Sequence, residues 1–596
     1  MGQKKKKENG EPQTTKEILL DKREAIEEDQ ETHNLNTFED LLELVGTRGR
    51  WNVRIFFICC AHMLGCPFAS LSYQFLGATP EHWCHVAPLV QANWTQDQIR
   101  SLAIPYWNET GQYEGCQMYD ANYALAADLG FERSQNNSEI LPRLDTVACE
   151  AWEFDSAEDE STVVTEWDLV CDRRPLYSSL QAVTQAGYLL GSLLMGYLCD
   201  RWGRRTVAVW STVLILVVGV AMTTIPVFWV FISLRLLFCI FIMGIYVPTF
   251  IISLEVSSPK LRSMAAILFI LPWAIGYMIL PGIAYVVRSW QRLQAVLISP
   301  YVPLLAYYWL LPESPRWLIQ QGRFKDALEL LSEAAEVNGR TLPPTAEILE
   351  AMGTIQKKLA EENKTEDKRD NNFLIRVLRN IVVVITKREL RTRSLAVFFC
   401  WFGVSMVYYG TALGATNLGV DIYTYMFLSG LLEIPAYLLL WPSIERLGRQ
   451  RTLVLLFFIC TVSISSVALI MFYFPNAPSG LKIFFSQSGK LCVTAAFHLT
   501  WIYTAEMFPT RYRSLAVGEG SCVARMGSIC SPYIIDILGE VSAWAPSAVF
   551  ALISLVASVL ALLLPETRNR AMLETGSSEG EASDPRIYTS SESSEA

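Results

Sequence analysis

The sequence has few charged residues and lacks the motifs of several common activities. Only 18% of its 596 residues are Asp, Glu, Lys or Arg. It contains no Gly-x-x-x-x-Gly-Lys-Ser/Thr loop to bind nucleotide phosphates, so we do not expect ATP to drive its activity directly. The one cluster of metal-ligand type, His82-Trp-Cys84-His85, has no evident fourth ligand, and its cysteine is expected in a disulfide. These absences argue against an enzyme, and we expect neither a resident cofactor nor a nucleic-acid partner.

What the chain has in abundance is apolar sequence. Hydrophobic residues make up 51% of it and the mean hydropathy is +0.26, too high for a string of soluble domains. Runs of roughly twenty apolar residues, enough to cross about 30 Å of hydrocarbon, occur as six, then a charged gap, then six more. The twelve predicted spans are 52–75, 177–199, 206–225, 228–252, 264–286, 293–311, 394–415, 422–442, 452–474, 481–503, 514–537 and 546–564.

This pattern predicts an all-α integral membrane protein with defined segments. The first fifty residues are polar and contain no cleavable signal peptide. Arg and Lys gather in alternate short loops, and the positive-inside rule then places both termini in the cytoplasm. The expected segments are a cytosolic tail 1–50 with a short amphipathic helix at 38–45, a six-helix half 51–311 with an outer loop 76–175, a cytosolic loop 312–393, a second half 394–564 and a disordered cytosolic tail 565–596.

The long outer loop supports this orientation independently, because it has the marks of an extracellular segment. Its N-glycosylation acceptors are Asn93, Asn108 and Asn136. Its cysteines, an even number in a segment expected to be oxidised, are Cys84, Cys116, Cys149 and Cys171. Four cysteines allow three pairings, and the sequence does not choose among them. We therefore expect a disulfide-bonded glycoprotein of the cell membrane.

An internal repeat relates the two halves. Asp200-Arg-Trp-Gly-Arg-Arg205 corresponds to Glu445-Arg-Leu-Gly-Arg449, and Pro312-Glu-Ser corresponds to Pro565-Glu-Thr, each about 250 residues apart. Acids and guanidinium groups at these helix ends can form bidentate ion pairs that hold the halves together in one conformation and release in another. The expected gating residues are Asp200, Arg201, Arg204, Arg205, Glu255, Arg262, Glu445, Arg446, Arg449, Glu506 and Arg513.

Two parallel six-helix halves resemble the plan of the major facilitator superfamily, in which the substrate binds between the halves near the midplane. Further motifs resemble the organic cation, anion and zwitterion transporters, solute carrier family 22. They are Thr165-Glu-Trp-Asp-Leu-Val-Cys-Asp172, Pro312-Glu-Ser-Pro-Arg-Trp317 and Glu433-Ile-Pro-Ala-Tyr437, and the resemblance spans about 37–570. The long outer loop and the charges within the apolar runs disfavour a sugar carrier.

Ionisable residues inside apolar runs are expensive to insert and are the first candidates for a binding site. They are Arg235, Glu433, Lys490, His498, Glu519 and Arg525. Arg525 lies near the middle of its run, and the resemblance implies that this position is basic in carriers of anions or carnitine-like zwitterions. A guanidinium group suits a carboxylate. The structural alternative is an ion pair of Arg525 with Glu433 or Glu519.

The rest of the expected pocket combines Glu433 with aromatic residues. Glu433 can receive a substrate ammonium group, take part in coupling, or pair with Arg525 or Lys490. Trp401 and Tyr408 are seven residues apart on one helix face, and the resemblance implies that they contact substrate. Tyr437 stands where anion carriers of the family often have Lys, which disfavours a purely anionic substrate.

The sequence thus predicts a carrier of small organic ions that works by alternating access, most directly for carnitine-like or β-amino-acid zwitterions. The alternatives are a carrier of organic anions or cations and a receptor that has kept the transporter scaffold. Na⁺, H⁺, exchange and facilitated flow all remain open as the mode of coupling.

Overall fold

The computed structural model describes residues 37–568, apart from 47, 108–111, 136–139, 141–144, 156–160, 259–260, 368–387, 416–417 and 509. The chain divides into two compact units. One comprises residues 1–52 and 315–366, and the other comprises 53–314 and 367–596. The tail 565–596 was predicted to be disordered, and it lies outside the described residues beyond 568.

The smaller unit is built from short amphipathic helices. Helix α2 (Phe38–Val45) covers the predicted 38–45 and begins with a capping box, in which Thr37 and Asp40 bond each other's backbone N–H groups. Helix α18 ends at Asn338, whose amide donates to the carbonyl oxygens of Val45 and Gly46. The remaining helices of this unit are α17 (Pro315–Gln320), α18 (Phe324–Asn338) and α19 (Thr345–Asp367).

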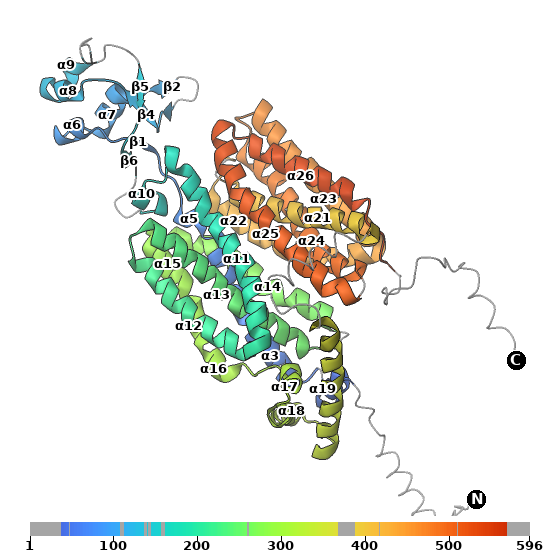
Figure 1. The fold of residues 1–596 in the computed structure, drawn as a ribbon. Coiled ribbons are helices and arrows are strands. Elements are labelled where there is room, and N and C mark those ends of the chain that lie inside the picture. Colours follow the sequence, from blue (N-terminus) through green and yellow to red (C-terminus); the bar gives the residue numbers. More distant parts are fainter. Residues whose placement is uncertain are drawn as a thin grey trace, which may run out of the picture. The chain divides into compact units, whose positions relative to one another are not determined.

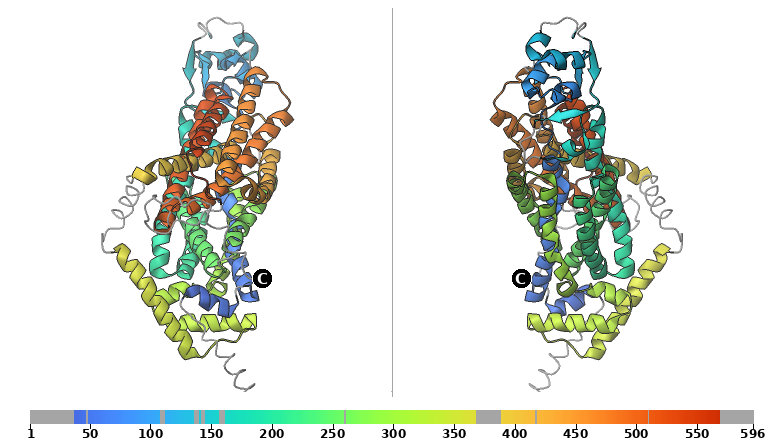
Figure 2. Two further views of the ribbon diagram at one scale, coloured as in Figure 1. Left: turned by 90° about the vertical axis from the view of Figure 1, so that its right-hand side faces the viewer. Right: turned by 90° about the vertical axis from the view of Figure 1, so that its left-hand side faces the viewer.

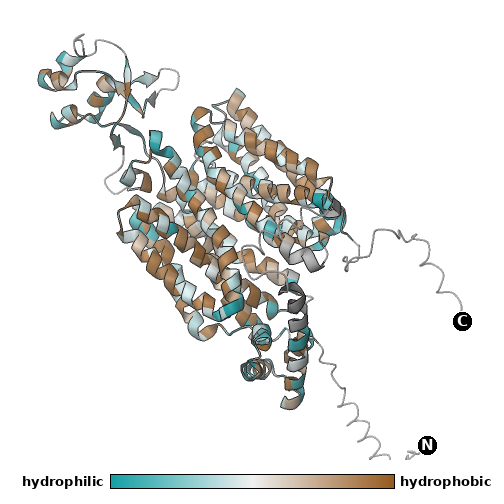
Figure 3. Ribbon diagram, in the orientation of Figure 1, coloured by the Kyte–Doolittle hydropathy of each residue, from teal (hydrophilic) through white to brown (hydrophobic). Residues whose placement is uncertain are grey.

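The larger unit contains the long apolar helices, which are coloured as hydrophobic along most of their length (Figure 3). In the first half they are α11 (Arg174–Trp202), α12 (Arg204–Thr224), α13 (Phe228–Glu255) and α14 (Arg262–Val286). In the second half they are α21 (Arg388–Leu413), α22 (Ile422–Leu447), α23 (Arg449–Tyr473), α24 (Ser479–Met507), α25 (Thr510–Val541) and α26 (Ala545–Ala561).

Two of the predicted spans are interrupted. The first is made of α3 (Arg50–Cys60), η1 (Ala61–Leu64), α4 (Cys66–Leu71) and α5 (Tyr73–Leu76). The sixth is made of α15 (Trp290–Ile298), η3 (Ser299–Tyr301), η4 (Pro303–Ala306) and α16 (Tyr307–Leu310). Proline at the start of α4, η3 and η4 lacks the N–H that an unbroken helix needs there, which explains the breaks.

All twelve predicted spans coincide with helical segments, but not all are equally apolar. Among the described residues, nine helical segments are long and apolar enough to cross a membrane. The other three are α24, α25 and α26. Helix α24 contains Lys490 and His498, α25 contains Glu519 and Arg525, and α26 is a shorter apolar helix. Two of these three helices, α24 and α25, therefore carry ionisable candidate residues, whereas α26 falls short only in length.

The outer loop folds into a small domain of short helices and paired strands, grouped at one end of the long helices in each view (Figures 1 and 2). The antiparallel pairs join β1 (His82–Cys84) to β6 (Trp152–Phe154), β2 (Tyr106–Trp107) to β3 (Gln112–Tyr113), and β4 (Gln117–Tyr119) to β5 (Thr146–Ala148). The helices are α6 (Ala87–Gln91), α7 (Gln96–Ala103), α8 (Tyr123–Leu129), α9 (Phe131–Ser134) and α10 (Val163–Trp167).

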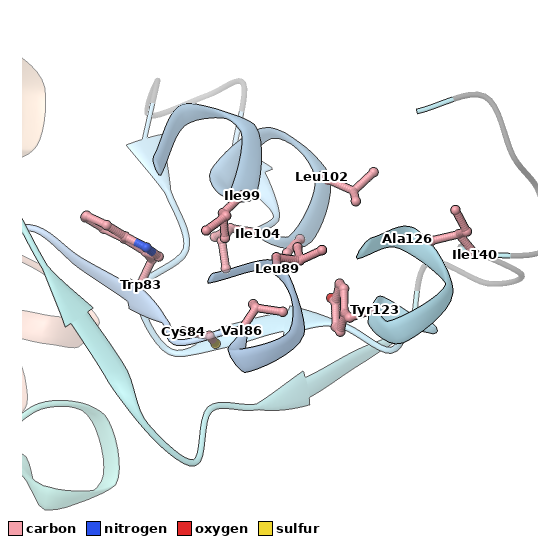
Figure 4. Packing of buried hydrophobic residues seen from close by; sticks show 11 residues of the cluster. Trp83, Cys84, Val86, Leu89, Ile99, Leu102, Ile104, Tyr123, Ala126 and Ile140 are labelled. Carbon is pink, nitrogen blue, oxygen red and sulfur yellow. The ribbon is translucent and has the colours of Figure 1, made fainter. Parts of the chain in front are cut away.

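This outer domain has its own apolar core and resolves the cysteine pairing. Trp83, Leu89 and Ile99 are buried together in it (Figure 4). The disulfides join Cys84 to Cys149 and Cys116 to Cys171, so all four predicted cysteines are bonded, in one of the three possible arrangements. Asn93 is exposed, as a glycosylation acceptor must be, whereas Asn108 and Asn136 lie outside the described residues.

Candidate functional site

Arg525 lies in the middle of α25, where this helix runs beside α11 and α21 (Figure 1). Its Nη1 donates to Gln185 Oε1 at 3.1 Å and to the hydroxyl of Tyr409 at 3.3 Å. Its guanidinium carbon lies 5.3 Å from the centroid of the Tyr188 ring. Gln185 and Tyr188 belong to the first half, and Tyr409 and Arg525 to the second. Arg525 therefore lies where the two halves meet, and its contact with substrate stays a prediction.

The contacts of Arg525 are all electrically neutral. Among the residues that the structure describes, no carboxylate lies within 4.0 Å of its guanidinium group. Neither of the ion pairs considered from the sequence, with Glu433 or with Glu519, is formed. The positive charge of Arg525 is therefore balanced by no neighbouring side chain in this part of the protein.

Glu433 pairs with Lys490 and not with Arg525. Its Oε1 accepts the Tyr408 hydroxyl at 2.7 Å and lies 3.9 Å from Lys490 Nζ, and its Oε2 accepts the Tyr437 hydroxyl at 2.7 Å. Lys490 Nζ also donates to the Tyr408 carbonyl oxygen at 3.2 Å and lies 3.1 Å from the centroid of the Tyr408 ring. Both charged groups are fully buried. Two hydroxyls and one ammonium group thus satisfy the Glu433 carboxylate.

Of the predicted aromatic residues, Tyr408 and Tyr437 contact this ion pair, and Trp401 lies further along α21. Trp401 is buried and donates from Nε1 to Thr504 Oγ1 at 3.1 Å, and its ring lies edge-on to Trp501. Tyr408 contacts Tyr409 and Phe497, with ring centroids 5.2 and 5.7 Å apart. Tyr408 therefore lies between the Glu433–Lys490 pair and Tyr409, the hydroxyl partner of Arg525.

Sequence reasoning did not assign two members of this cluster to the site, Gln185 and Tyr409, which hold the Arg525 guanidinium group. The pairing of Glu433 with Lys490 was one of the alternatives that the sequence left open, and it is the one that the structure forms. A buried ammonium group requires a nearby acid or acceptor. No sequence signal marked Gln185, which is 340 residues from Arg525.

The predicted gating residues form one cluster in each half. In the first, Arg204 lies 3.3 Å from the Asp200 carboxylate and 4.0 Å from that of Glu255. In the second, Arg449 makes a bidentate pair with Glu506, with both distances 2.9 Å. These contacts join residues within a half. The predicted bridging of one half to the other by these pairs stays a prediction.

The two clusters share a helix cap that the sequence reasoning did not identify. Glu313 accepts the backbone N–H groups of Arg204 and Arg205, where α12 begins. Glu566 accepts those of Arg449 and Gln450, where α23 begins. A carboxylate at a helix N-terminus satisfies unpaired N–H groups and complements the helix dipole. The repeated Pro-Glu-Ser/Thr motif therefore caps the equivalent helix in each half.

The other predicted gating residues have more limited contacts. Arg205 donates to the Tyr308 carbonyl oxygen and Arg262 to that of Leu254. The side chain of Arg513 lies outside the described residues. The exposed members of the gating set are Asp200, Arg201, Glu445 and Arg446.

The two halves contact each other at the ends of α11 and α25 nearest the outer domain. Arg174 Nε lies 3.0 Å from Glu540 Oε1, and Ser178 Oγ donates to Asp536 Oδ2 at 2.5 Å. Nearby, Gln74 donates to the Leu413 carbonyl oxygen at 2.6 Å. We call the Arg174–Glu540 and Ser178–Asp536 contacts the outer latch. They hold the two halves together beside the outer domain.

Comparisons with known proteins agree with this architecture. The family model described as "Sugar (and other) transporter" matches residues 142–576. The chain is 32% identical to organic cation/carnitine transporter 2 of Mus musculus over 547 residues, which cover 89% of this chain and 92% of that protein. It is 30% identical to the beta-alanine transporter of Drosophila melanogaster over 567 residues, which cover 91% and 89%.

Among solved structures, the partially occluded inward-open xylose transporter of E. coli is similar in fold. The TM-score is 0.56 at 13% sequence identity, and the match covers 87% of this chain and 99% of that one. At this identity the likeness shows the fold, which is that of a major facilitator.

Proposed function

The chain belongs to the sugar (and other) transporter family of the major facilitator superfamily and, within it, to solute carrier family 22, whose members carry small organic ions, and from this premise we propose that its substrates are zwitterions. It is a membrane transporter and not an enzyme. Relatives named for carnitine and for beta-alanine support a substrate with one carboxylate and one cationic group. The proposed location is the cell membrane, with both termini in the cytoplasm.

The observation that carries this proposal is the unbalanced charge of Arg525. Its contacts with Gln185 and Tyr409 orient the guanidinium group without neutralising it. A substrate carboxylate supplies the missing charge, and a planar guanidinium group can bind it with two parallel hydrogen bonds.

The cationic group of the substrate has an aromatic environment available. Tyr188 and Tyr409 contact Arg525, and ring faces attract ammonium groups by about 0.5–2 kcal/mol each. Tyr408 packs against Tyr409, but its own ring face is occupied by Lys490. Glu433 is less available to it, because Lys490 already balances its charge. In this proposal Glu433 acts through Tyr408, whose hydroxyl it holds, and Trp401 and Tyr437 complete the wall.

Transport follows by alternating access. With the outer latch closed, substrate bound at Arg525 is shut off from the side of the outer domain. Opening this latch while the opposite ends close exposes Arg525 to the extracellular side. The matched Glu313 and Glu566 caps keep the helix ends rigid, so that each half can move as a body.

The outer latch gives a prediction about this motion. In the double variant Ser178→Cys/Asp536→Cys, an oxidant should join the two cysteines and block uptake by about tenfold or more, because a cross-link across the latch prevents its opening. Reduction should restore uptake, and each single variant under the same oxidant is the control. Cross-linked protein that still transports would mean that these ends do not separate.

The substrate class is tested by uptake into cells that express the chain. A labelled carnitine-like zwitterion, a permanent organic cation and a dicarboxylate are compared at matched surface expression. We expect saturable uptake of the zwitterion above the other two. Preference for the dicarboxylate or for the cation would move the chain to the anion or cation carriers, and no saturable uptake of any probe would favour a receptor.

A further inference from the structure

Glu519 is a buried acid that the proposed binding site does not use. It lies on α25, six residues before Arg525, and is only 7% exposed. Neither of its carboxyl oxygens has a hydrogen-bond partner, and no cation lies within 4.0 Å of it among the described residues. Glu433, which is 1% exposed, has two tyrosine hydroxyls and Lys490 as partners. Within the described part of the chain, Glu519 therefore has none of the partners that stabilise a buried negative charge.

The helices packed against α25 do not supply a missing partner. A Cβ on the adjacent Gly520 would come within 2.4 Å of Trp401 Nε1, so α21 presses closely on α25 here. That indole nitrogen donates to Thr504 instead. The described titratable groups of these helices lie on α11, α21, α24 and α25, whereas α26 has none. They are Arg174, Tyr177, Tyr188, Tyr197, Cys199, Asp200 and Arg201 on α11; Arg391, Arg393, Cys400, Tyr408 and Tyr409 on α21; Lys482, Lys490, Cys492, His498, Tyr503 and Glu506 on α24; and Cys522, Arg525, Cys530, Tyr533, Asp536 and Glu540 on α25 itself. The side chains of Arg511 and Arg513 on α25 lie outside the described residues.

We propose that Glu519 is a proton-binding site and that a proton enters the cell with each substrate molecule. The inference rests on the proposed function, since it concerns the same transport cycle. The step is a reversible protonation, in which the carboxylate takes a proton from one side and releases it on the other. A carboxylic acid is neutral, so it occupies this apolar position, which offers no partner among the described residues, at a lower energetic cost than a carboxylate does.

Arg525 couples this proton to the substrate. Six residues correspond to about 9 Å along a helix, close enough for the charges to interact strongly in an apolar surrounding. When a substrate carboxylate neutralises Arg525, nothing favours ionised Glu519 and the proton stays bound. When the substrate leaves, the exposed guanidinium charge favours ionisation of Glu519, and the proton follows. Substrate and proton are thus released together.

The test is zwitterion uptake by cells that express the full chain, at external values of about pH 5.5 and about pH 7.5. Wild type should take up the zwitterion several-fold faster at the lower pH and acidify the cytosol as it does so. Glu519→Gln should be insensitive to pH and carry no proton, yet should exchange labelled for unlabelled zwitterion at the wild-type rate. Glu519→Asp should retain part of the pH response. The matched control is Glu132→Gln, an exposed acid of the outer domain.

The outcomes separate this proposal from the function on which it rests. If wild type shows no saturable zwitterion uptake at either pH, the proposed function fails. If wild type takes up the zwitterion equally at both pH values, or if Glu519→Gln retains the pH response and the proton flux, the function stands and Glu519 is not the proton site. If Glu519→Gln loses exchange as well as net uptake at normal surface expression, Glu519 serves binding rather than coupling, and the proposal is overturned.

Discussion

Replacing Arg525 with alanine is expected to lower zwitterion uptake by about 30-fold or more at low substrate concentration, because losing one member of a buried charge pair costs about 2–5 kcal/mol. The carboxylate would then enter an apolar centre with only Gln185 and Tyr409 to receive it. Arg525→Lys keeps the charge but loses the planar donor fork, so it should retain intermediate uptake. The measurement is initial uptake of labelled zwitterion, normalised to surface protein.

Two controls make this result specific. Arg292→Ala removes an exposed arginine outside the site and should leave uptake unchanged. A permanent cation, if carried at all, should be carried as well or better by Arg525→Ala, because a positive charge has been removed from its path. Zwitterion uptake that is indifferent to the loss of Arg525 would show that this arginine is structural and that the substrate class is wrong.

Removing only one member of the Glu433–Lys490 pair is expected to destabilise the whole transporter. Glu433→Gln leaves a fully buried ammonium group without its counter-charge, which costs about 3–5 kcal/mol. That is a large part of the net stability of about 5–15 kcal/mol typical of folded proteins. We expect a clear fall in surface expression and in the thermal unfolding temperature of the purified protein. Lys490→Met should be milder, because the carboxylate keeps both tyrosine hydroxyls.

The double variant Glu433→Gln/Lys490→Met tests the cause. Because it leaves no uncompensated charge, its unfolding temperature should return most of the way to that of wild type. Its uptake should remain low, since Tyr408 loses the carboxylate that holds its hydroxyl. Lys325→Met, which removes an exposed lysine of the smaller unit, is the control. A double variant as unstable as Glu433→Gln would mean that the two charges do not stabilise each other.

The sequence was sufficient for the membrane plan of this protein, because that plan depends on local and repeated patterns. Runs of apolar residues predicted twelve spans, each of which coincides with helical segments, because crossing the bilayer requires a certain length of helix whatever its neighbours. The repeat of Pro312-Glu-Ser as Pro565-Glu-Thr showed the two halves, and Glu313 and Glu566 do cap equivalent helices. The helix breaks within the first and sixth spans were not predicted, although proline marks their positions.

The sequence predicted the charged residues of the candidate site but not how they pair. Burial of charge in apolar runs picked out Arg525, Glu433, Lys490 and Glu519, because the energetic penalty of such residues does not depend on the fold. Which of them pair depends on how helices far apart in the chain approach one another. Only the tertiary structure shows that Glu433 pairs with Lys490 and that Arg525 contacts Gln185 and Tyr409. It also shows that Glu519 has no partner among the residues it describes.

The cysteines of the outer loop show the same division. Their number and setting predicted two disulfides, since an even set of thiols in an extracellular loop is expected to be oxidised. The choice of Cys84 with Cys149 and Cys116 with Cys171 required the folded outer domain, in which the pairings of β1 with β6 and of β4 with β5 bring distant segments together. Sequence by itself determined which residues are buried or oxidised, because those properties follow from composition and local pattern; the tertiary structure decided their partners, because contacts between distant segments exist only once the chain has folded.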